Sequence, residues 1–305
     1  MNPRLRAWLL IGILAVVCIL SVGGVAWYRA RPLSPGLLLK IMPTQDAVVL
    51  YIDFAALRRG GILQLLEGSK ASEDPDYQAF VERINFDYRE DLDSALVTFA
   101  PSGKFMLVKG RFDWKRLHSY AIESGGRCVV ATCRMAGSAP DRRISFFPVQ
   151  SGLLALAVST DDSAVVALTE RPSGKPEEVP NAPIWLRIPG SFLKSPGNLP
   201  TGTRMFTHGM EEADHLTFTF VPEGRSLAAT LEIRCNDEEH AVRIASQLAS
   251  ATLTLRQMLE REHTTPDPGD PAAVLSSGTF RSEGKTVFGH WPLDRSFIEH
   301  LIGVS

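Results

Sequence analysis

The hydrophobic and polar positions divide the chain into one long apolar segment near its start and a much longer region of short patterned segments. Residues 7–28 (AWLLIGILAVVCILSVGGVAWY) contain no charged side chain and are long enough to cross the roughly 30 Å hydrocarbon layer as a helix. Trp8, Trp27 and Tyr28 lie near the ends of this segment, where amphipathic rings favour the membrane interface. The pattern predicts a membrane-spanning helix that anchors the chain in a lipid bilayer.

A cleaved export signal is the alternative interpretation of residues 7–28, because such signals also join a charged start to an apolar run. The run is longer than the roughly 7–15 residues of a signal core, and no small-x-small site precedes the polar region, which favours a retained anchor. Arginines flank the run equally, so the positive-inside preference leaves the orientation open. With no second apolar span, we expect a single-pass protein of the bacterial inner membrane whose remaining residues lie in the periplasm.

Behind the predicted anchor, two segments of similar sequence organise the chain. Residues 88–104 (YREDLDSALVTFAPSGK) and 209–225 (GMEEADHLTFTFVPEGR) align without gaps and share a Pro-x-Gly, at Pro101 and Pro222. Proline presets φ at a turn's first corner, and glycine supplies the positive φ needed to leave it. Each segment therefore predicts a β-hairpin.

Elements of the same kinds flank both hairpins in the same order. A strand and a short helix precede each hairpin, and a helix, a second hairpin and a short helix follow it. The long helices begin after Asp113 and Asn236, whose side chains can cap the first turn. The expected flanking elements are residues 47–54, 55–67, 114–123, 144–149, 153–159 and 161–169, and then 184–188, 191–194, 237–262, 278–281, 285–291 and 295–302.

Two copies of β-α-β-β-α-β-β-α therefore account for the chain behind the anchor. Their strands alternate apolar and polar residues, which indicates antiparallel sheets with one face covered by helices. The sequence predicts an α+β fold with two such sheets, and it leaves open whether the two are joined as a pseudo-symmetric pair. The expected segments are an N-terminal tail and transmembrane anchor (1–31), a tether (32–43), a first module (44–170), a proline-rich linker (171–183) and a second module (184–305). The first copy carries an extra helix at 75–91, which a loop at 196–203 replaces in the second.

Composition narrows the classes of partner. The chain is 45% hydrophobic, which suffices for a real core, and its formal net charge is −2. There is thus no global basic field to attract nucleic acid. The helix at 237–262 has an apolar stripe, which we expect to cover its own sheet, the alternative being a binding surface for a partner or for a second copy of the chain. The stripe is Ala241, Ile244, Leu248, Ala251, Leu255, Met258 and Leu259.

Three cysteines lie behind the anchor, Cys128, Cys133 and Cys235, so an intramolecular disulfide leaves one thiol unpaired. On one continuous strand, Cys128 and Cys133 would be about 16 Å apart on opposite faces, too far to bridge. The intervening residues 129–132 (VVAT) do not resemble a turn, and a bridge requires a bend there. The sequence therefore does not decide whether Cys128 and Cys133 form a disulfide. It shows no CxxC or paired-histidine zinc motif.

The remaining chemical motifs are weak. Ser191 and Lys194 form an SxxK, but the partner motifs of the penicillin-binding enzymes are absent. Acidic residues 90, 91 and 93 are echoed by 211, 212 and 214 and could offer oxygen ligands to calcium, although the spacing fits no EF-hand. Seven histidines (118, 208, 215, 240, 263, 290 and 300) form no zinc pair. Dinucleotide, P-loop and GxSxG motifs are also absent, so the sequence indicates neither a cofactor nor catalytic residues.

Residues 42–58 (MPTQDAVVLYIDFAALR) follow the anchor directly. The phrase Pro43, Asp46-Ala47, Tyr51, Asp53 and Leu57-Arg58 resembles the opening of a duplicated extracytoplasmic domain in a group of uncharacterised bacterial single-pass envelope proteins. That resemblance implies the architecture and no functional residues. The expected function is a non-catalytic binding or scaffold module that acts near the membrane on an envelope partner, the alternative being an extracytoplasmic enzyme of unrecognised chemistry.

Overall fold

The computed structural model describes residues 33–65, 81–137, 139–170, 172–194, 210, 213–223, 226–261, 270–294 and 297. The predicted anchor at 7–28 lies outside these residues, and none of the helices among them has the length and apolar character that a membrane span requires. The chain forms two compact units, Met1–Ser34 and Pro35–Ser305. The fold described here is that of the second unit.

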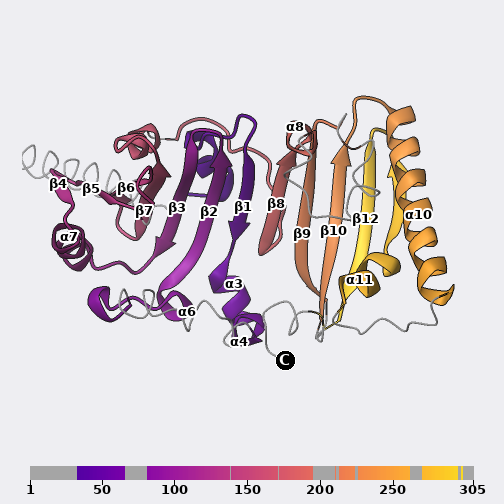
Figure 1. The fold of residues 1–305 in the computed structure, drawn as a ribbon, viewed down its shortest axis with the longest axis horizontal. Coiled ribbons are helices and arrows are strands. Elements are labelled where there is room, and N and C mark those ends of the chain that lie inside the picture. The colour runs from indigo at the N-terminus through magenta and orange to yellow at the C-terminus, as the bar shows by residue number, and fades with distance from the viewer. Residues whose placement is uncertain are drawn as a thin grey trace, which may run out of the picture. The chain divides into compact units, whose positions relative to one another are not determined.

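Within the described residues, twelve strands form one antiparallel sheet in the order β11-β12-β10-β9-β8-β1-β2-β3-β7-β6-β5-β4 (Figure 1). The protein thus has an α+β fold with a large antiparallel sheet and helices. The strands are β1 Val48–Ile52, β2 Leu92–Ala100, β3 Gly103–Gly110, β4 Arg127–Val129, β5 Thr132–Ala136, β6 Arg143–Gln150, β7 Leu153–Ser159, β8 Ile184–Pro189, β9 His215–Glu223, β10 Ser226–Arg234, β11 Thr279–Glu283 and β12 Thr286–Leu293.

The two sheets expected from the sequence are joined into one, because β1 and β8 pair with each other. Their antiparallel register places Tyr51 opposite Trp185, and the two rings stack with centroids 5.5 Å apart. Each of these strands would otherwise be an open sheet edge, and pairing satisfies the backbone groups of both. Outward from this joint the order is β1-β2-β3-β7-β6 on one side and β8-β9-β10-β12-β11 on the other.

Both predicted hairpins are present, as β2–β3 and β9–β10. In the first, Gly103 has a φ of 145°, and a Cβ there would come within 2.7 Å of the Val158 carbonyl oxygen, so the position requires glycine. In the second, Pro222 belongs to β9 opposite Leu227 and so does not stand at the first corner of a turn, and residues 224–225 lie outside the described residues.

The helices of the described residues are short except for two. The two longer helices are α7 Trp114–Glu123 and α10 Glu238–Arg261. The short ones are α2 Pro35–Leu38, η1 Leu39–Ile41, α3 Phe54–Arg59, α4 Ile62–Leu65, α6 Tyr88–Asp91, η3 Ala164–Leu168, α8 Gly190–Leu193 and α11 Pro271–Ser277. The single helix expected at 55–67 is interrupted at Gly60–Gly61, where Gly61 has a φ of 71°. Residues 35–41 of the expected tether form α2 and η1, and Leu39 is fully buried there.

Aspartates cap the two long helices. The Asp113 carboxylate accepts from the backbone amides of Lys115 and Arg116 at the start of α7, as predicted. At the start of α10, Asp237 takes the role expected of Asn236, since its carboxylate accepts from the backbone amide of His240 at 2.8 Å. Helix α11, which was not predicted, begins with Pro271 behind Asp270, whose carboxylate accepts from the Ala272 amide. An aspartate followed by proline is a recognisable start of a helix.

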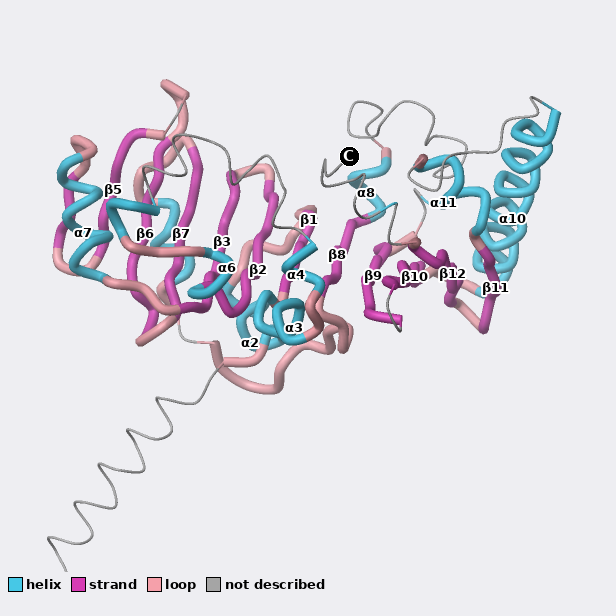
Figure 2. The backbone as a smooth tube through the Cα atoms, turned by 90° about the horizontal axis from the view of Figure 1, so that it is seen from below, coloured by secondary structure: helices cyan, strands magenta, loops and turns pink. Residues whose placement is uncertain are grey.

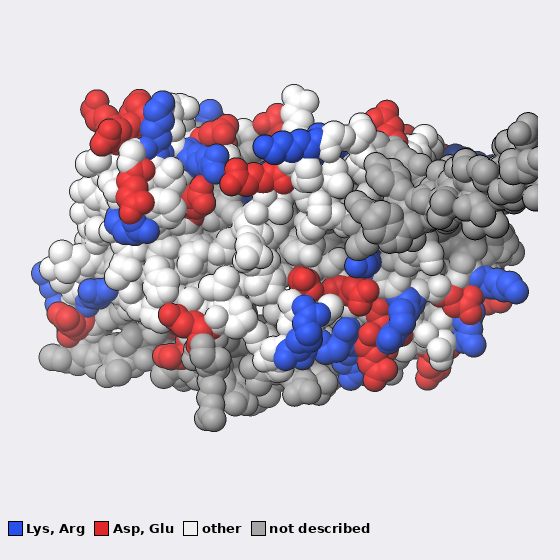
Figure 3. Space-filling view, turned by 180° about the vertical axis from the view of Figure 1, so that it is seen from behind, with Lys and Arg blue, Asp and Glu red and all other residues white. Residues whose placement is uncertain are grey.

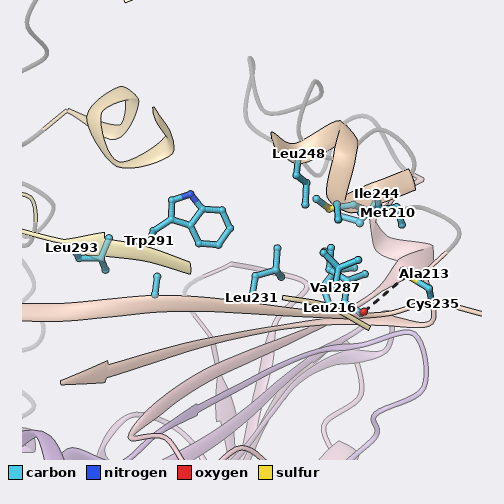
Figure 4. Close-up of a cluster of buried hydrophobic side chains, with 14 of the residues drawn as sticks. Met210, Ala213, Leu216, Leu231, Cys235, Ile244, Leu248, Val287, Trp291 and Leu293 are labelled. Atoms are coloured by element: carbon cyan, nitrogen blue, oxygen red, sulfur yellow. Dashed lines mark hydrogen bonds between the residues drawn. The ribbon is translucent and has the colours of Figure 1, made fainter. Parts of the chain in front are cut away.

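The second half of the sheet, formed by β8–β12 within residues 184–305, is covered on one face by α10 and α11 (Figure 2). Leu231 and Val287 from the sheet meet Ile244 and Leu248 from α10 in a buried cluster (Figure 4). Ile233 belongs to the same cluster. The predicted stripe on α10 is buried at its first four positions, whereas Met258 is 50% exposed. The prediction that this helix covers its own sheet is thus correct for the first half of the helix.

Residues 44–170, the first half of the sheet, are covered on both faces, contrary to the expectation of one. Phe146 on β6 packs with Leu117 and Ala121 of α7. Its neighbour Ser145 points to the other face by strand alternation, and its hydroxyl accepts from the Val165 amide of η3 at 3.2 Å. Strands β4 and β5, which were not predicted as a hairpin, extend this half of the sheet.

Candidate functional site

A polar groove of about 860 Å³ lies on the face of the second half that α10 leaves open. Ile233 and Leu231 on β10 point to α10, so alternation directs the intervening and flanking side chains of that strand to the open face. The residues that line the floor from β9 to β12 include Thr217, Thr219, Thr230, Glu232, Arg234, Thr279, Arg281, Phe288 and His290. No described helix lies on this side of β9–β12 in Figure 2.

The linker predicted at 171–183 forms one wall of the groove. Arg187 on β8 donates from Nη2 to the Glu178 carbonyl oxygen at 3.2 Å, and its Nη1 lies 3.8 Å from the Glu177 carboxylate. The Glu177 amide donates to the Gly36 carbonyl at 3.0 Å. A Cβ at Gly36 would lie 2.1 Å from the Glu177 carbonyl oxygen, so this close approach requires glycine. The segment is therefore held at both sides and gives the groove a fixed wall.

Charges of both signs line the groove. Arg187, Arg234 and Arg281 face Glu177, Glu178 and Glu232 among the lining residues. Arg234 pairs with Glu232 at 3.1 Å, and Arg281 pairs with Glu283 on its own strand. Seen from behind, basic and acidic side chains are interspersed around an uncharged area (Figure 3). The described part of this face therefore shows no single-sign field that would concentrate a polyanion or a polycation.

The groove also offers hydroxyls, aromatic rings and imidazoles. The Thr219 and Thr230 hydroxyls hydrogen-bond each other across β9 and β10. The Arg281 guanidinium lies 4.7 Å from the centre of the Phe288 ring, a cation–π geometry. His290 Nε2 lies 3.8 Å from the Glu223 carboxylate. The described lining contains no serine, cysteine or lysine, and its threonine, glutamate, histidine and arginine side chains offer hydrogen bonds and ion pairs.

The structure places the SxxK residues in a separate, shallower pocket of about 620 Å³ with Asp46, Asp214 and Asn236. The Ser191 hydroxyl donates to the Asp46 carboxylate at 2.9 Å, and Asp46 has a φ of 51°. The serine proton is therefore directed to a carboxylate from the loop before β1 and not to Lys194.

The described acidic residues of the suggested calcium sites do not converge. Asp91 accepts from the Arg111 Nε at 2.9 Å and from the Asp87 amide. Asp214 contacts His215 Nδ1 at 2.9 Å. Glu211 and Glu212 lie outside the described residues. The Asp91 and Asp214 carboxylates thus have protein partners, and the described residues bring no three acidic side chains of these segments together.

Among the histidines, three of the seven lie outside the described residues, namely 208, 263 and 300. His215 and His290 line the groove, and His240 contacts its own helix cap Asp237 at 2.7 Å. His118 alone of the described histidines lies beside cysteines, with one of its ring nitrogens and the sulfurs of Cys128 and Cys133 all within 4.8 Å of one another.

Cys128 and Cys133 are joined by a disulfide across the β4–β5 hairpin, with Cα atoms 4.0 Å apart. The turn of this hairpin could not be predicted from the sequence, because Val130 has a φ of 57°. β-branched residues rarely adopt that conformation. Cys235 is free and buried. Burial, with a smaller effect from the Asp237 charge, raises the pKa of the Cys235 thiol, which disfavours the reactive thiolate.

No protein-family model matches the chain, and no curated protein sequence matches it. Among solved structures, the chain resembles TP0453, a Treponema envelope-associated protein. Crystal form IV is 10% identical with a TM-score of 0.49 and covers 89% of this chain and 97% of that chain. Crystal form III is 11% identical with a TM-score of 0.48 and covers 90% of this chain and 99% of that chain. The resemblance is weak.

Proposed function

We propose that the protein is a membrane-anchored binding module of the bacterial envelope, and that the groove on the open face of β8–β12 receives its partner. The observation that carries this proposal is the groove itself, an 860 Å³ hollow with convergent arginine, glutamate, threonine and histidine side chains. A concave surface with a few placed polar groups is the usual form of a binding site.

The charge pattern supports an extended polypeptide with both charge signs as the partner. The groove's arginines already have acidic neighbours, Arg187 beside Glu177 and Arg234 beside Glu232. A simple anion would have to displace these acids, whereas a segment with both signs can exchange one ion pair for another. The partly exposed Phe288 ring and the threonine hydroxyls suit side chains and backbone groups of a peptide.

Residues 7–28 support the anchor, and the Cys128–Cys133 disulfide supports an oxidising compartment such as the periplasm. A C-terminal alkaline phosphatase fusion should be active, because that enzyme requires export. Strong fluorescence of a C-terminal green fluorescent protein fusion, together with an inactive phosphatase fusion, would contradict the periplasmic assignment.

We also propose that the two halves arose by duplication. The equal strand order on both sides of the β1–β8 joint supports this, as does the match between residues 88–104 and 209–225. In this proposal β8, β9, β10, β11 and β12 correspond to β1, β2, β3, β6 and β7. The β4–β5 hairpin then belongs to the first half alone.

The groove assignment can be tested with a photo-crosslinking amino acid in the full-length protein, expressed in cells of its source bacterium. Position 281 lies on the groove and is 62% exposed at its side chain. Position 242 on α10 is a matched control, because Val242 is 52% exposed and belongs to the helix on the opposite face. We expect a discrete cross-linked protein from position 281 and none from 242. Equal cross-linking from both positions, or none from 281, would contradict the proposal.

A further inference from the structure

The second chemically distinctive cluster lies at the other end of the sheet, away from the groove. His118 on α7 and the cysteines of the β4–β5 hairpin bring one nitrogen and two sulfurs within 4.8 Å of one another. From this geometry we infer that the reduced hairpin binds a zinc ion through His118, Cys128 and Cys133. The inference is independent of the groove and of its proposed partner.

The ligand types and the hairpin suit zinc. Two thiolates and one imidazole form a Cys₂His set, and such a set leaves a fourth position open for water or another ligand. The Cys-x₄-Cys spacing falls within the range found in zinc hairpins. Zn–S bonds of about 2.3 Å and Zn–N bonds of about 2.0 Å place ligand atoms roughly 3.5 Å apart around a tetrahedral ion. After reduction the two sulfurs must move apart to reach these separations, and rotation of the cysteine side chains can supply that movement.

The backbone holds the three ligands in place. Cys128 lies directly opposite Cys133 in the antiparallel register, so both side chains point to the same face of the hairpin. The Gly126 amide donates to the Ala121 carbonyl at 2.8 Å, which ties the start of β4 to the end of α7. A Cβ at Gly126 would lie 2.7 Å from that same carbonyl, so the glycine permits this close contact. His118 is one helical turn before Ala121 and therefore lies over the hairpin.

The nearest basic side chains point away from the cysteine sulfurs, and burial shields one of the sulfurs. Strand alternation directs the neighbouring arginines, Arg127 and Arg134, to the face opposite the cysteines. Arg127 is also paired with Asp162 at 3.5 Å. Cys133 is fully buried, whereas His118 and Cys128 are only partly buried. An ion can therefore enter past His118 and Cys128 and reach a sulfur that is shielded from water.

The redox state decides between the disulfide and the zinc site. A dithiol reductant attacks the disulfide, transfers two electrons and two protons to the Cys128 and Cys133 sulfurs, and leaves as its own disulfide. Zn²⁺ then replaces the two thiol protons, which are released to solvent. The reverse step needs a disulfide oxidant, which accepts two electrons from the two thiolates, takes up two protons from solvent and leaves as a dithiol. The Cys128–Cys133 bond forms again and Zn²⁺ is released, because a disulfide sulfur is not a thiolate ligand.

The test uses the full-length protein in mild detergent, reduced with dithiothreitol and then desalted without oxygen. Titration with Co²⁺ should give the thiolate-to-cobalt charge-transfer band and the visible bands of a tetrahedral site, and Zn²⁺ should abolish them at one ion per chain. The oxidised protein, which has the same sequence, should give no such bands. Absence of the bands in the fully reduced protein would overturn the proposal.

Single substitutions separate this site from other ligands. His118→Ala should weaken Zn²⁺ binding by about tenfold or more, since one of three ligands is lost. His240→Ala is the matched control in α10, and Cys235→Ser is the control for the remaining cysteine behind the anchor; both should bind as the wild type does. Equal melting temperatures of oxidised wild type and His118→Ala would show that folding is intact. Wild-type affinity in His118→Ala, or loss of binding in Cys235→Ser, would contradict the assignment.

Discussion

The two halves of the sheet share a strand order but differ in what covers them. In the first half, α7 packs on one face and η3 on the other, so the strands of that half form an interior. In the second half, α10 covers one face and the opposite face holds the groove. The comparison shows that one strand arrangement can form a two-sided core or a surface for binding, depending on the segments between the strands.

The helices after the two hairpins extend the contrast. Helix α10 spans 24 residues and its buried positions lie on the sheet, whereas α7 spans 10 residues and is followed by the β4–β5 hairpin. The shorter helix ends at the hairpin, and the cysteine–histidine cluster forms where the two meet. The first half therefore holds the cysteine–histidine cluster, and the second half holds the groove.

The largest expected effect concerns the joint between the halves. Trp185 on β8 is fully buried and stacks on Tyr51 of β1. Trp185→Ala should lower the free energy of unfolding by about 3–5 kcal/mol, and Trp185→Phe by less, because the ring contact remains. Denaturant unfolding followed by circular dichroism would measure both. Two separate transitions, of which only one moves, would show that the halves unfold independently.

A second prediction compares the two faces of one strand. Ile233 on β10 is fully buried under α10, and its neighbour Glu232 points to the groove. Ile233→Ala should cost about 2–5 kcal/mol of stability. Glu232→Ala should change stability by no more than about 0.5 kcal/mol, while it weakens partner cross-linking from position 281. A large loss of stability from Glu232→Ala would show that the groove face is part of the core.

The third prediction concerns the hairpin that only the first half has. Removing the Cys128–Cys133 disulfide with a double serine substitution should destabilise the oxidised protein by roughly 2 kcal/mol, from the closure entropy of a short loop. Thermal melts with a zinc chelator present would measure it. Dithiothreitol should lower the melting temperature of the wild type and of Cys235→Ser, but not of the double variant. An equal response of all three would exclude a stabilising disulfide.

The smallest effect concerns the cap of α10. The hydrogen bond from the His240 backbone amide, followed by the one from its side chain, lowers the pKa of Asp237. A carboxyl whose folded pKa is lowered contributes stability above its unfolded pKa of about 3.9, and loses it as the pH falls through the folded pKa. Asp237→Asn should therefore lose less stability than the wild type between about pH 4 and pH 2.

Glu239→Gln, in the same first turn but 89% exposed at its side chain, is the control for the cap. Acid titrations monitored by circular dichroism would compare the three proteins. Identical acid curves for Asp237→Asn and the wild type would contradict this role of the cap.

Local sequence patterns were sufficient to predict much of the fold. The Pro-x-Gly segments predicted both central hairpins, Asp113 predicted the start of α7, and the apolar stripe at 237–262 predicted a helix on its sheet. These features depend on turn geometry, capping and amphipathic spacing, which act over a few residues. The same kind of signal at Asp270-Pro271 marks α11 and was overlooked.

Tertiary contacts decided the rest. The pairing of β1 with β8, which turns two sheets into one, depends on two edges 132 or more residues apart in the register (Ile52 with Ile184) that no local pattern links. The groove exists because threonine, arginine and histidine side chains from five strands meet on one face. The cysteine–histidine cluster requires a turn at Val130, where the local preference of the residue opposes the conformation it adopts. By itself the sequence determined the two central hairpins, the start of α7 and the apolar stripe of α10, which depend on local geometry. Only the packing of distant segments determined which faces are covered and which side chains converge, because those depend on contacts that span the whole chain.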